Sequence, residues 1–193
     1  MTYVPKASST QPLEGIDINA VYTAATATAT GYDPAYPAPP FLVGTETIGN
    51  NDSRFVFVTV STSCNKGDFV VAATGIASFT VVQLQTSIAA GVFGQQIGVA
   101  MATGTTGQFL WMQTEGENQA ANVVAATTAG VPLFTSGTAG YLTSVEATAT
   151  NFPVYGVALF TTATAAQTVA TANLTNVAIG LITSTAANVG IAF

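Results

Sequence analysis

From Ser53 onward, short stretches of β-forming residues alternate with turn residues along the chain. Arg54–Val60 combines Phe, Val and Thr in the manner of a strand, and Asn65–Asp68 follows as a turn in which Gly67 can adopt a positive φ. Strands that recur every roughly 8–15 residues are typical of β-sandwiches and β-barrels. The sequence therefore predicts an all-β fold, a compact sandwich or barrel of about eight to ten short strands.

The expected strands share β-branched or aromatic residues and are bounded by Gly, Pro or Asn. They are predicted at residues 54–60, 69–73, 79–85, 97–101, 107–114, 122–125, 132–134, 140–143, 153–160 and 177–182. A further, weak edge strand is predicted at Ala25–Thr30, where Ala and Thr alternate with the two-residue period of a strand. Residues 163–172 are the best helical candidate, but their threonines and their lack of charged pairs argue against a helix.

The first fifty residues differ from the rest because they hold most of the eight prolines. Proline fixes its own φ and favours extended geometry in the residue before it, so the cluster Asp33–Phe41 is expected to be extended. We predict an extended, proline-rich N-terminal arm over residues 1–50 and a β domain over residues 51–193. The arm is either a long loop packed on its own domain or a segment that reaches a neighbouring subunit. Its candidate contact residues are Tyr32, Tyr36, Pro37, Pro39, Pro40 and Phe41.

The charge composition excludes several classes of function. Charged residues make up 6% of the chain, with three Lys and Arg, nine Asp and Glu and no His, for a net charge of −6. Because cations are so few, we expect no nucleic-acid partner and no polybasic docking on a membrane. The absence of His excludes Ser-His-Asp and Cys-His nucleophile systems. No apolar run reaches the length of a membrane span, and residues 1–15 lack the pattern of a secretion signal.

Two glutamates are the strongest candidates for chemistry. Glu115 and Glu117 lie two residues apart after the predicted strand at 107–114, and they would share a face if that strand continued. An acid–base pair needs two carboxyl groups in different environments, whereas both of these flank Gly116 and are expected to be solvated. We interpret them as a charged strand end that discourages edge pairing.

The other notable residues have structural interpretations. Arg54 is expected to form an ion pair with Asp52 or Glu46. Cys64 has no partner for an intramolecular disulfide and is expected to be buried, and Trp111 is expected in a core strand. The sequence thus predicts no catalytic residue, no cofactor and no metal site, and therefore a protein that is not an enzyme.

The nearly uncharged surface points to association. Strands with few lysines at their edges tend to pair edge to edge when they are left free. Large permanent interfaces bury such edges and tolerate a low charge. We therefore expect a closed homo-oligomer, or docking on a repeating partner surface.

Between residues 44 and 182, several short motifs occur in a characteristic order. They are Arg54–Val58, Lys66–Val71, Gly98–Ala100, Gly107–Gly116, Ala120–Val123, Val131–Thr135, Thr138–Leu142 and Gly156–Ala158. As an ordered series, they resemble the head decoration (cement) proteins of tailed bacteriophages. The resemblance implies a small β domain without catalytic residues that sits on the outside of an icosahedral shell. There it would bridge neighbouring capsomers and stabilise them against the pressure of the genome.

The resemblance also implies partners and a location. The partners would be the major capsid protein and further copies of the chain, with a homotrimer favoured over a dimer because three-fold capsid positions select matching symmetry. The protein would be made in the host cytoplasm and would act on the outer surface of the virion. The alternative is a receptor- or glycan-binding adhesive module of a phage fibre or surface protein. Such a module would hold glycans on exposed Trp111, Tyr141 or Tyr155, and burial of these rings would argue against it.

Overall fold

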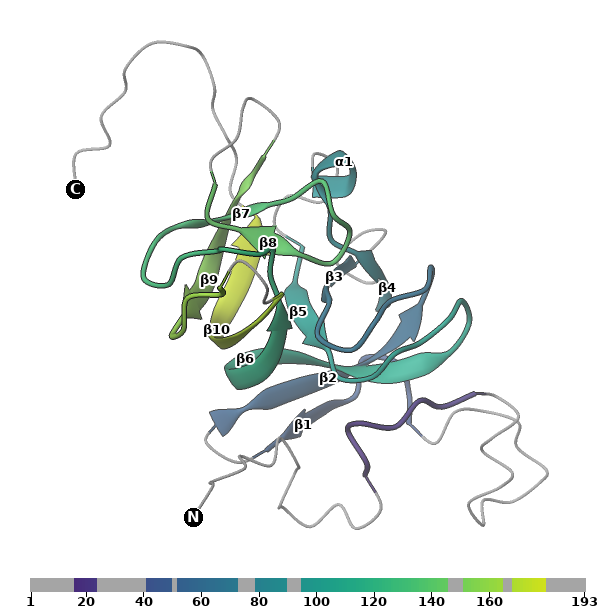
Figure 1. Ribbon diagram of the computed structural model, residues 1–193. Helices are drawn as coiled ribbons and strands as arrows, with labels where there is room; N and C mark the ends of the chain where they lie inside the picture. The colour runs from purple at the N-terminus through teal and green to yellow at the C-terminus, as the bar shows by residue number, and fades with distance from the viewer. Residues whose placement is uncertain are drawn as a thin grey trace, which may run out of the picture.

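The computed structural model describes residues 16–23, 41–49, 52–72, 79–89, 95–145, 151–164 and 168–179 (Figure 1). Within these ranges the fold is all-β, as predicted. The strands are β1 (Glu46–Ile48), β2 (Arg54–Val60), β3 (Phe69–Ala72), β4 (Thr80–Gln83), β5 (Ile97–Ala100), β6 (Phe109–Asn122), β7 (Leu133–Thr135), β8 (Leu142–Thr143), β9 (Pro153–Leu159) and β10 (Val169–Ile179). A single turn of helix, α1 (Thr86–Ala89), follows β4.

Five strands close into a small barrel. The strands follow the order β1-β2-β4-β3-β5-β6-β10-β9-β7-β8, and an additional pairing of β2 with β6 joins two non-adjacent members of this order. The strands β2, β4, β3, β5 and β6 therefore form a closed ring, in which only the β2–β4 pairing is parallel. Its interior is filled by residues from all five strands, among them Val58, Val70, Val81, Ala100 and Leu110. Closure removes the free edges of these strands.

A second layer lies beside the barrel. In Figure 1, β7, β8, β9 and β10 lie to one side of β5 and β6, and β2, β3 and β4 lie to the other. The core between the layers takes Phe69 and Val71 from the outer face of the barrel and Leu159, Ala172 and Leu174 from the second layer. The sequence analysis left a sandwich and a barrel open as alternatives. The structure is a barrel with an added layer.

The long strand β6 belongs to both layers. We predicted two separate strands at 107–114 and 122–125, but the chain continues as one strand from Phe109 to Asn122. Gly116 allows this path because its φ of 91° is one that L side chains rarely adopt, and the chain bends there against Ser53. The buried side chain of Gln113 stabilises the bend, since its Nε2 donates to the carbonyl oxygens of Glu115 and Glu117, both at 3.0 Å.

The strand β10 begins earlier than predicted. It runs from Val169 to Ile179, whereas we placed a strand at 177–182 and a weak helical candidate at 163–172. The described residues 169–172 are not helical, in agreement with the argument against a helix from their threonines and lack of charged pairs. They pair on one side with β6 and continue the strand that pairs with β9.

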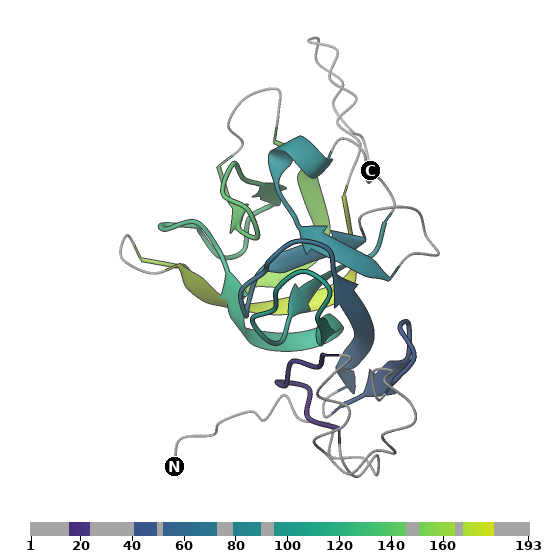
Figure 2. The same cartoon turned by 90° about the vertical axis from the view of Figure 1, so that its right-hand side faces the viewer.

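The described parts of the first fifty residues pack on the barrel. The segment 16–23 lies beneath the strands in both views, where Ile18 is buried and Tyr22 forms an antiparallel bridge with Phe109 (Figures 1 and 2). Farther along, β1 pairs with β2. The Phe41 ring contacts those of Phe57 and Trp111, with centroid distances of 5.3 and 5.2 Å. The predicted strand Ala25–Thr30 lies outside the described residues.

Candidate interaction surfaces

The two glutamates singled out in the sequence lie within β6 and not at a strand end. Glu115 is opposite Arg54 in the β2–β6 register, and their Oε2 and Nε atoms are 2.9 Å apart. The predicted ion pairs of Arg54 with Asp52 or Glu46 are therefore corrected to an ion pair with Glu115, which cross-strand pairing brings into reach. Glu117 is exposed and accepts a hydrogen bond from Gln119 Nε2 at 3.2 Å.

Asp68 is the buried charge that sequence reasoning missed. Its carboxylate accepts three hydrogen bonds: from Asn65 N at 2.7 Å, from Gln83 Nε2 at 2.6 Å and from Asn122 Nδ2 at 2.7 Å. The group thus joins the turn before β3 to β4 and to the end of β6, and this network satisfies a carboxylate that would otherwise be costly to bury. Two of these partners are 15 and 54 residues away in the chain, so no local sequence pattern indicates this role.

Cys64 and Trp111 are buried, as predicted. Burial raises the pKa of the Cys64 thiol to about 11, which leaves it protonated and unreactive at neutral pH. Partial burial also raises the pKa of the Tyr22 hydroxyl, which donates to Asp17 O at 2.9 Å. Within the described ranges, no group of three or more His, Cys, Asp or Glu residues is placed to hold a metal ion.

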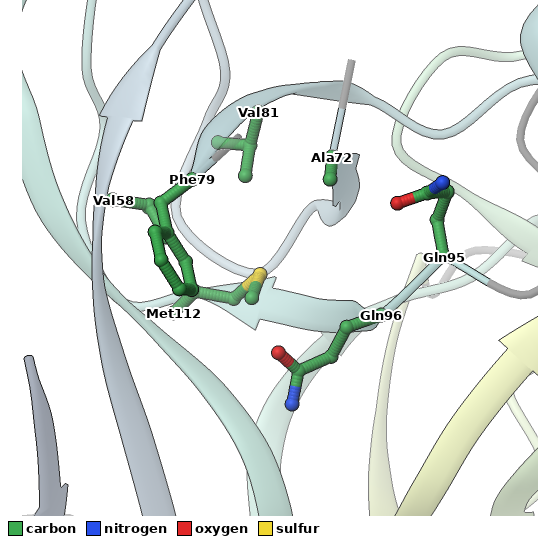
Figure 3. A pocket seen from close by; sticks show the side chains of 7 residues that line it. All are labelled: Val58, Ala72, Phe79, Val81, Gln95, Gln96 and Met112. Carbon is green, nitrogen blue, oxygen red and sulfur yellow. The ribbon is translucent and has the colours of Figure 1, made fainter. Parts of the chain in front are cut away.

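One hollow opens at the end of the barrel core (Figure 3). It has a volume of about 80 Å³ and is lined by Val58, Ala72, Phe79, Val81, Gln95, Gln96 and Met112. Figure 3 shows the Phe79 ring and the Met112 side chain on one side, with the two glutamines across from Phe79. Sites for drug-sized ligands measure about 300–1,000 Å³, so this hollow is too small for such a ligand.

Large apolar side chains are exposed in two separate regions. Leu42, 84% exposed, precedes β1, and Ile48, 56% exposed, is the last residue of β1. We call these two residues the arm-base surface. Tyr155 and Phe160, both 60% exposed, lie on or just after β9. Counted through the β2–β6 pairing, the strands β2, β6 and β10 lie between β1 and β9, so three strands separate the two regions. The remaining exposed large apolar residues among those described are Val131, Val145 and Val169.

The outward face of β9 has a shallow depression and carries no charged side chain. We call Tyr155, Gly156, Ala158 and Phe160 the β9 surface. Gly156, with φ of 78°, interrupts the regular strand, and together with Val157, Ala158, Asn173 and Thr175 it lines a surface hollow of about 250 Å³. Gly156 has no side chain, so it lines this hollow without filling it.

Part of one edge of β9 has no partner strand among the described residues. On one side, β9 pairs with β10 along much of its length. On the other side, β7 pairs only with Pro153 and Val154. The nearby segment after β6 reaches the residues beyond β9, where Ala126 N donates to Thr164 O and Ala129 N donates to Thr162 Oγ1. Among the described residues, therefore, no strand pairs with the edge of β9 from Val157 to Leu159.

Most of the charged residues precede β9 in the sequence, but Glu117 on β6 lies opposite Asn173 of β10, which in turn lies opposite Ala158 on β9. All three cations and eight of the nine acidic residues precede Asn118, and Glu146 is the only charged residue after it. The half of the sequence that contains the β9 surface is therefore nearly uncharged, while the whole chain carries a net charge of −6.

The sequence-predicted contact residues are described only in part. Tyr32, Tyr36, Pro37, Pro39 and Pro40 lie outside the described residues. Phe41 is half-buried in the aromatic cluster on its own domain. Of the three rings of the adhesive alternative, Trp111 is fully buried, Tyr141 is half-buried and Tyr155 is exposed.

No family model matches the chain, and no curated protein matches it. Among the described residues, no helix is long and apolar enough to cross a membrane.

Proposed function

We propose that the protein is a structural, non-enzymatic component of a phage virion, a decoration (cement) protein that binds the outer surface of an icosahedral head. The proposal rests on the ordered motifs between residues 44 and 182. The observation that best supports it is the separation of the arm-base surface from the β9 surface. A protein that joins neighbours needs two such contact regions, and each of them here exposes large apolar side chains.

In this proposal the arm-base surface faces the major capsid protein. Leu42 and Ile48 would be buried against the shell, and burial of apolar area would supply the free energy of attachment. Tyr32, Tyr36, Pro37, Pro39 and Pro40 would extend the same contact. Phe41, held by Phe57 and Trp111, would anchor this segment to the barrel. Attachment at more than one point would make the later contacts intramolecular and raise the avidity.

Co-sedimentation with empty heads assembled from the cognate major capsid protein tests the proposal. The full chain should sediment with the heads, and Leu42→Asp and Ile48→Asp should each reduce the bound fraction severalfold. Val145→Asp is the matched control, because it adds the same charge at a side chain that is also exposed, but away from β1. Absence of binding by the unaltered chain, or equal loss in the control, would count against the proposal.

One observation supports the alternative function, a glycan-binding adhesive module. Tyr155 is exposed on the same strand as the hollow lined by Asn173 and Thr175, and glycan sites combine aromatic stacking with such polar groups. Screening of the full chain on a glycan array, with Tyr155→Ala as the control, distinguishes the two functions. Binding that is lost in Tyr155→Ala would favour the adhesive module.

A further inference from the structure

We propose that the free edge of β9 pairs with β9 of a second copy of this chain, in an antiparallel arrangement about a two-fold axis that passes beside Ala158. The pairing would be a property of the isolated protein and does not depend on attachment to a capsid. It gives a dimer, the second of the two oligomeric states expected from the sequence.

The backbone of β9 determines the register. Phe160 N donates to Thr171 O at 2.9 Å, so the backbone polar groups of Phe160 face β10. Because these groups alternate between the two edges of a strand, those of Leu159 and Val157 face the free edge. A two-fold axis beside Ala158 places Val157 of each copy opposite Leu159 of the other. Each opposed pair then exchanges N–H···O=C hydrogen bonds in both directions.

The side chains of the β9 surface fit this register. With Ala158 opposite Ala158 of the second copy, Phe160 lies opposite Gly156 of the second copy. Gly156 has no side chain and lines a hollow of about 250 Å³, while the Phe160 ring is 60% exposed and on the same face. Each copy thus offers an aromatic ring and receives one, and a ring packed over a cross-strand glycine is a known way to stabilise a sheet.

The β9 surface itself carries no charge, and Glu117 lies two strands away, in register with Ala158 through Asn173. Two chains that each carry −6 repel each other, and the repulsion is least where charge is absent. No charged residue lies in the described ranges 118–145, 151–164 and 168–179. The edge also lacks the devices that normally prevent pairing, because Val157–Leu159 contains no Lys and no Pro.

Sedimentation velocity on the full chain, over concentrations from nanomolar to high micromolar, tests the proposal. The unaltered chain should form a dimer. In Ala158→Lys, two ammonium groups would meet at the axis, with Cβ atoms about 5 Å apart, so the dimer dissociation constant should rise at least about tenfold. Ala158→Glu should have the same effect. An equimolar mixture of the two variants should recover a heterodimer, because only at a two-fold axis does each residue face its own copy.

Val169→Lys is the control, since it adds a charge at an exposed position of β10 away from the free edge, and it should dimerise like the unaltered chain. Circular dichroism and thermal unfolding establish that each variant is folded. A monomer at all concentrations in the unaltered chain would overturn the proposal. An oligomer that Ala158→Lys does not weaken, or a Lys and Glu mixture that stays monomeric, would overturn it as well.

Discussion

The backbone of Gly140 lies directly against the buried side chain of Asp68. A Cβ added at Gly140 would be 2.7 Å from the Asp68 Cβ, a distance that real structures essentially never show. Phe69 N also donates to Gly140 O at 2.8 Å, so the turn before β8 is held against the start of β3. Two motifs of the resemblance, far apart in sequence, therefore meet at a single point in the fold.

Gly140→Ala is predicted to destabilise the protein by about 3 kcal/mol, as the sum of a positive-φ penalty and a steric clash with Asp68. Gly130→Ala is the matched control. The φ of Gly130, 73°, is similar to the 80° of Gly140, but a Cβ at Gly130 would meet nothing within 4 Å. Gly130→Ala should therefore lower the free energy of unfolding by only about 1 kcal/mol. Urea unfolding measures both. Equal losses in the two variants would contradict the close approach.

Asp68→Asn is predicted to lower the free energy of unfolding by about 2–4 kcal/mol. The new amide would turn a donor toward groups that all donate to the present carboxylate, namely Asn65 N, Gln83 Nε2 and Asn122 Nδ2. Asp52→Asn, at an exposed position with a φ of 57° that Asn tolerates, should change stability by less than about 0.5 kcal/mol. A similar small effect of both substitutions would show that the network around Asp68 is not important for stability.

The Cys64 thiol makes the free energy of unfolding depend on pH in the alkaline range. Its pKa rises from 9.0 to about 11 in the folded protein, so above pH 9 the unfolded chain loses this proton first. The contribution to stability is therefore complete below pH 9 and is lost as the pH rises to about 11. The difference in unfolding free energy between the unaltered chain and Cys64→Ala, measured from pH 8 upward, should shrink over this range. A constant difference would contradict the burial of the thiol.

Glu115→Gln is predicted to lower the free energy of unfolding by only about 0.5 kcal/mol, because the ion pair with Arg54 is partly exposed to solvent. The cost should decrease at high salt. Glu117→Gln, which leaves that ion pair intact, should have no measurable effect. Thermal unfolding at two salt concentrations distinguishes the two variants, and a loss of several kcal/mol in either would mean that the glutamate has a role beyond this surface contact.

Local patterns predicted most strands but not how the strands join. Arg54–Val60 was predicted with the observed bounds because its alternating Phe and Val side chains serve two opposite cores. The continuity of β6 was missed because Glu115 and Glu117 were interpreted as a charged strand end, whereas the buried Gln113 side chain donates hydrogen bonds to the backbone there and keeps the strand in the sheet.

The sites depend on contacts that are distant in sequence, and these were harder to predict. The importance of Asp68 comes from Gln83 and Asn122, which are 15 and 54 residues away. The free edge of β9 depends on how few residues β7 contributes to that side, a property of topology that no window of sequence contains. The low charge of the chain, by contrast, is visible in composition alone.

Cryo-electron microscopy of cognate phage heads incubated with the full chain tests the proposed function most directly. The account predicts density for the β domain on the outer surface, at boundaries between capsomers, with the end that carries Leu42 and Ile48 facing the shell. Heads without added density, or domains attached through the β9 surface, would contradict it.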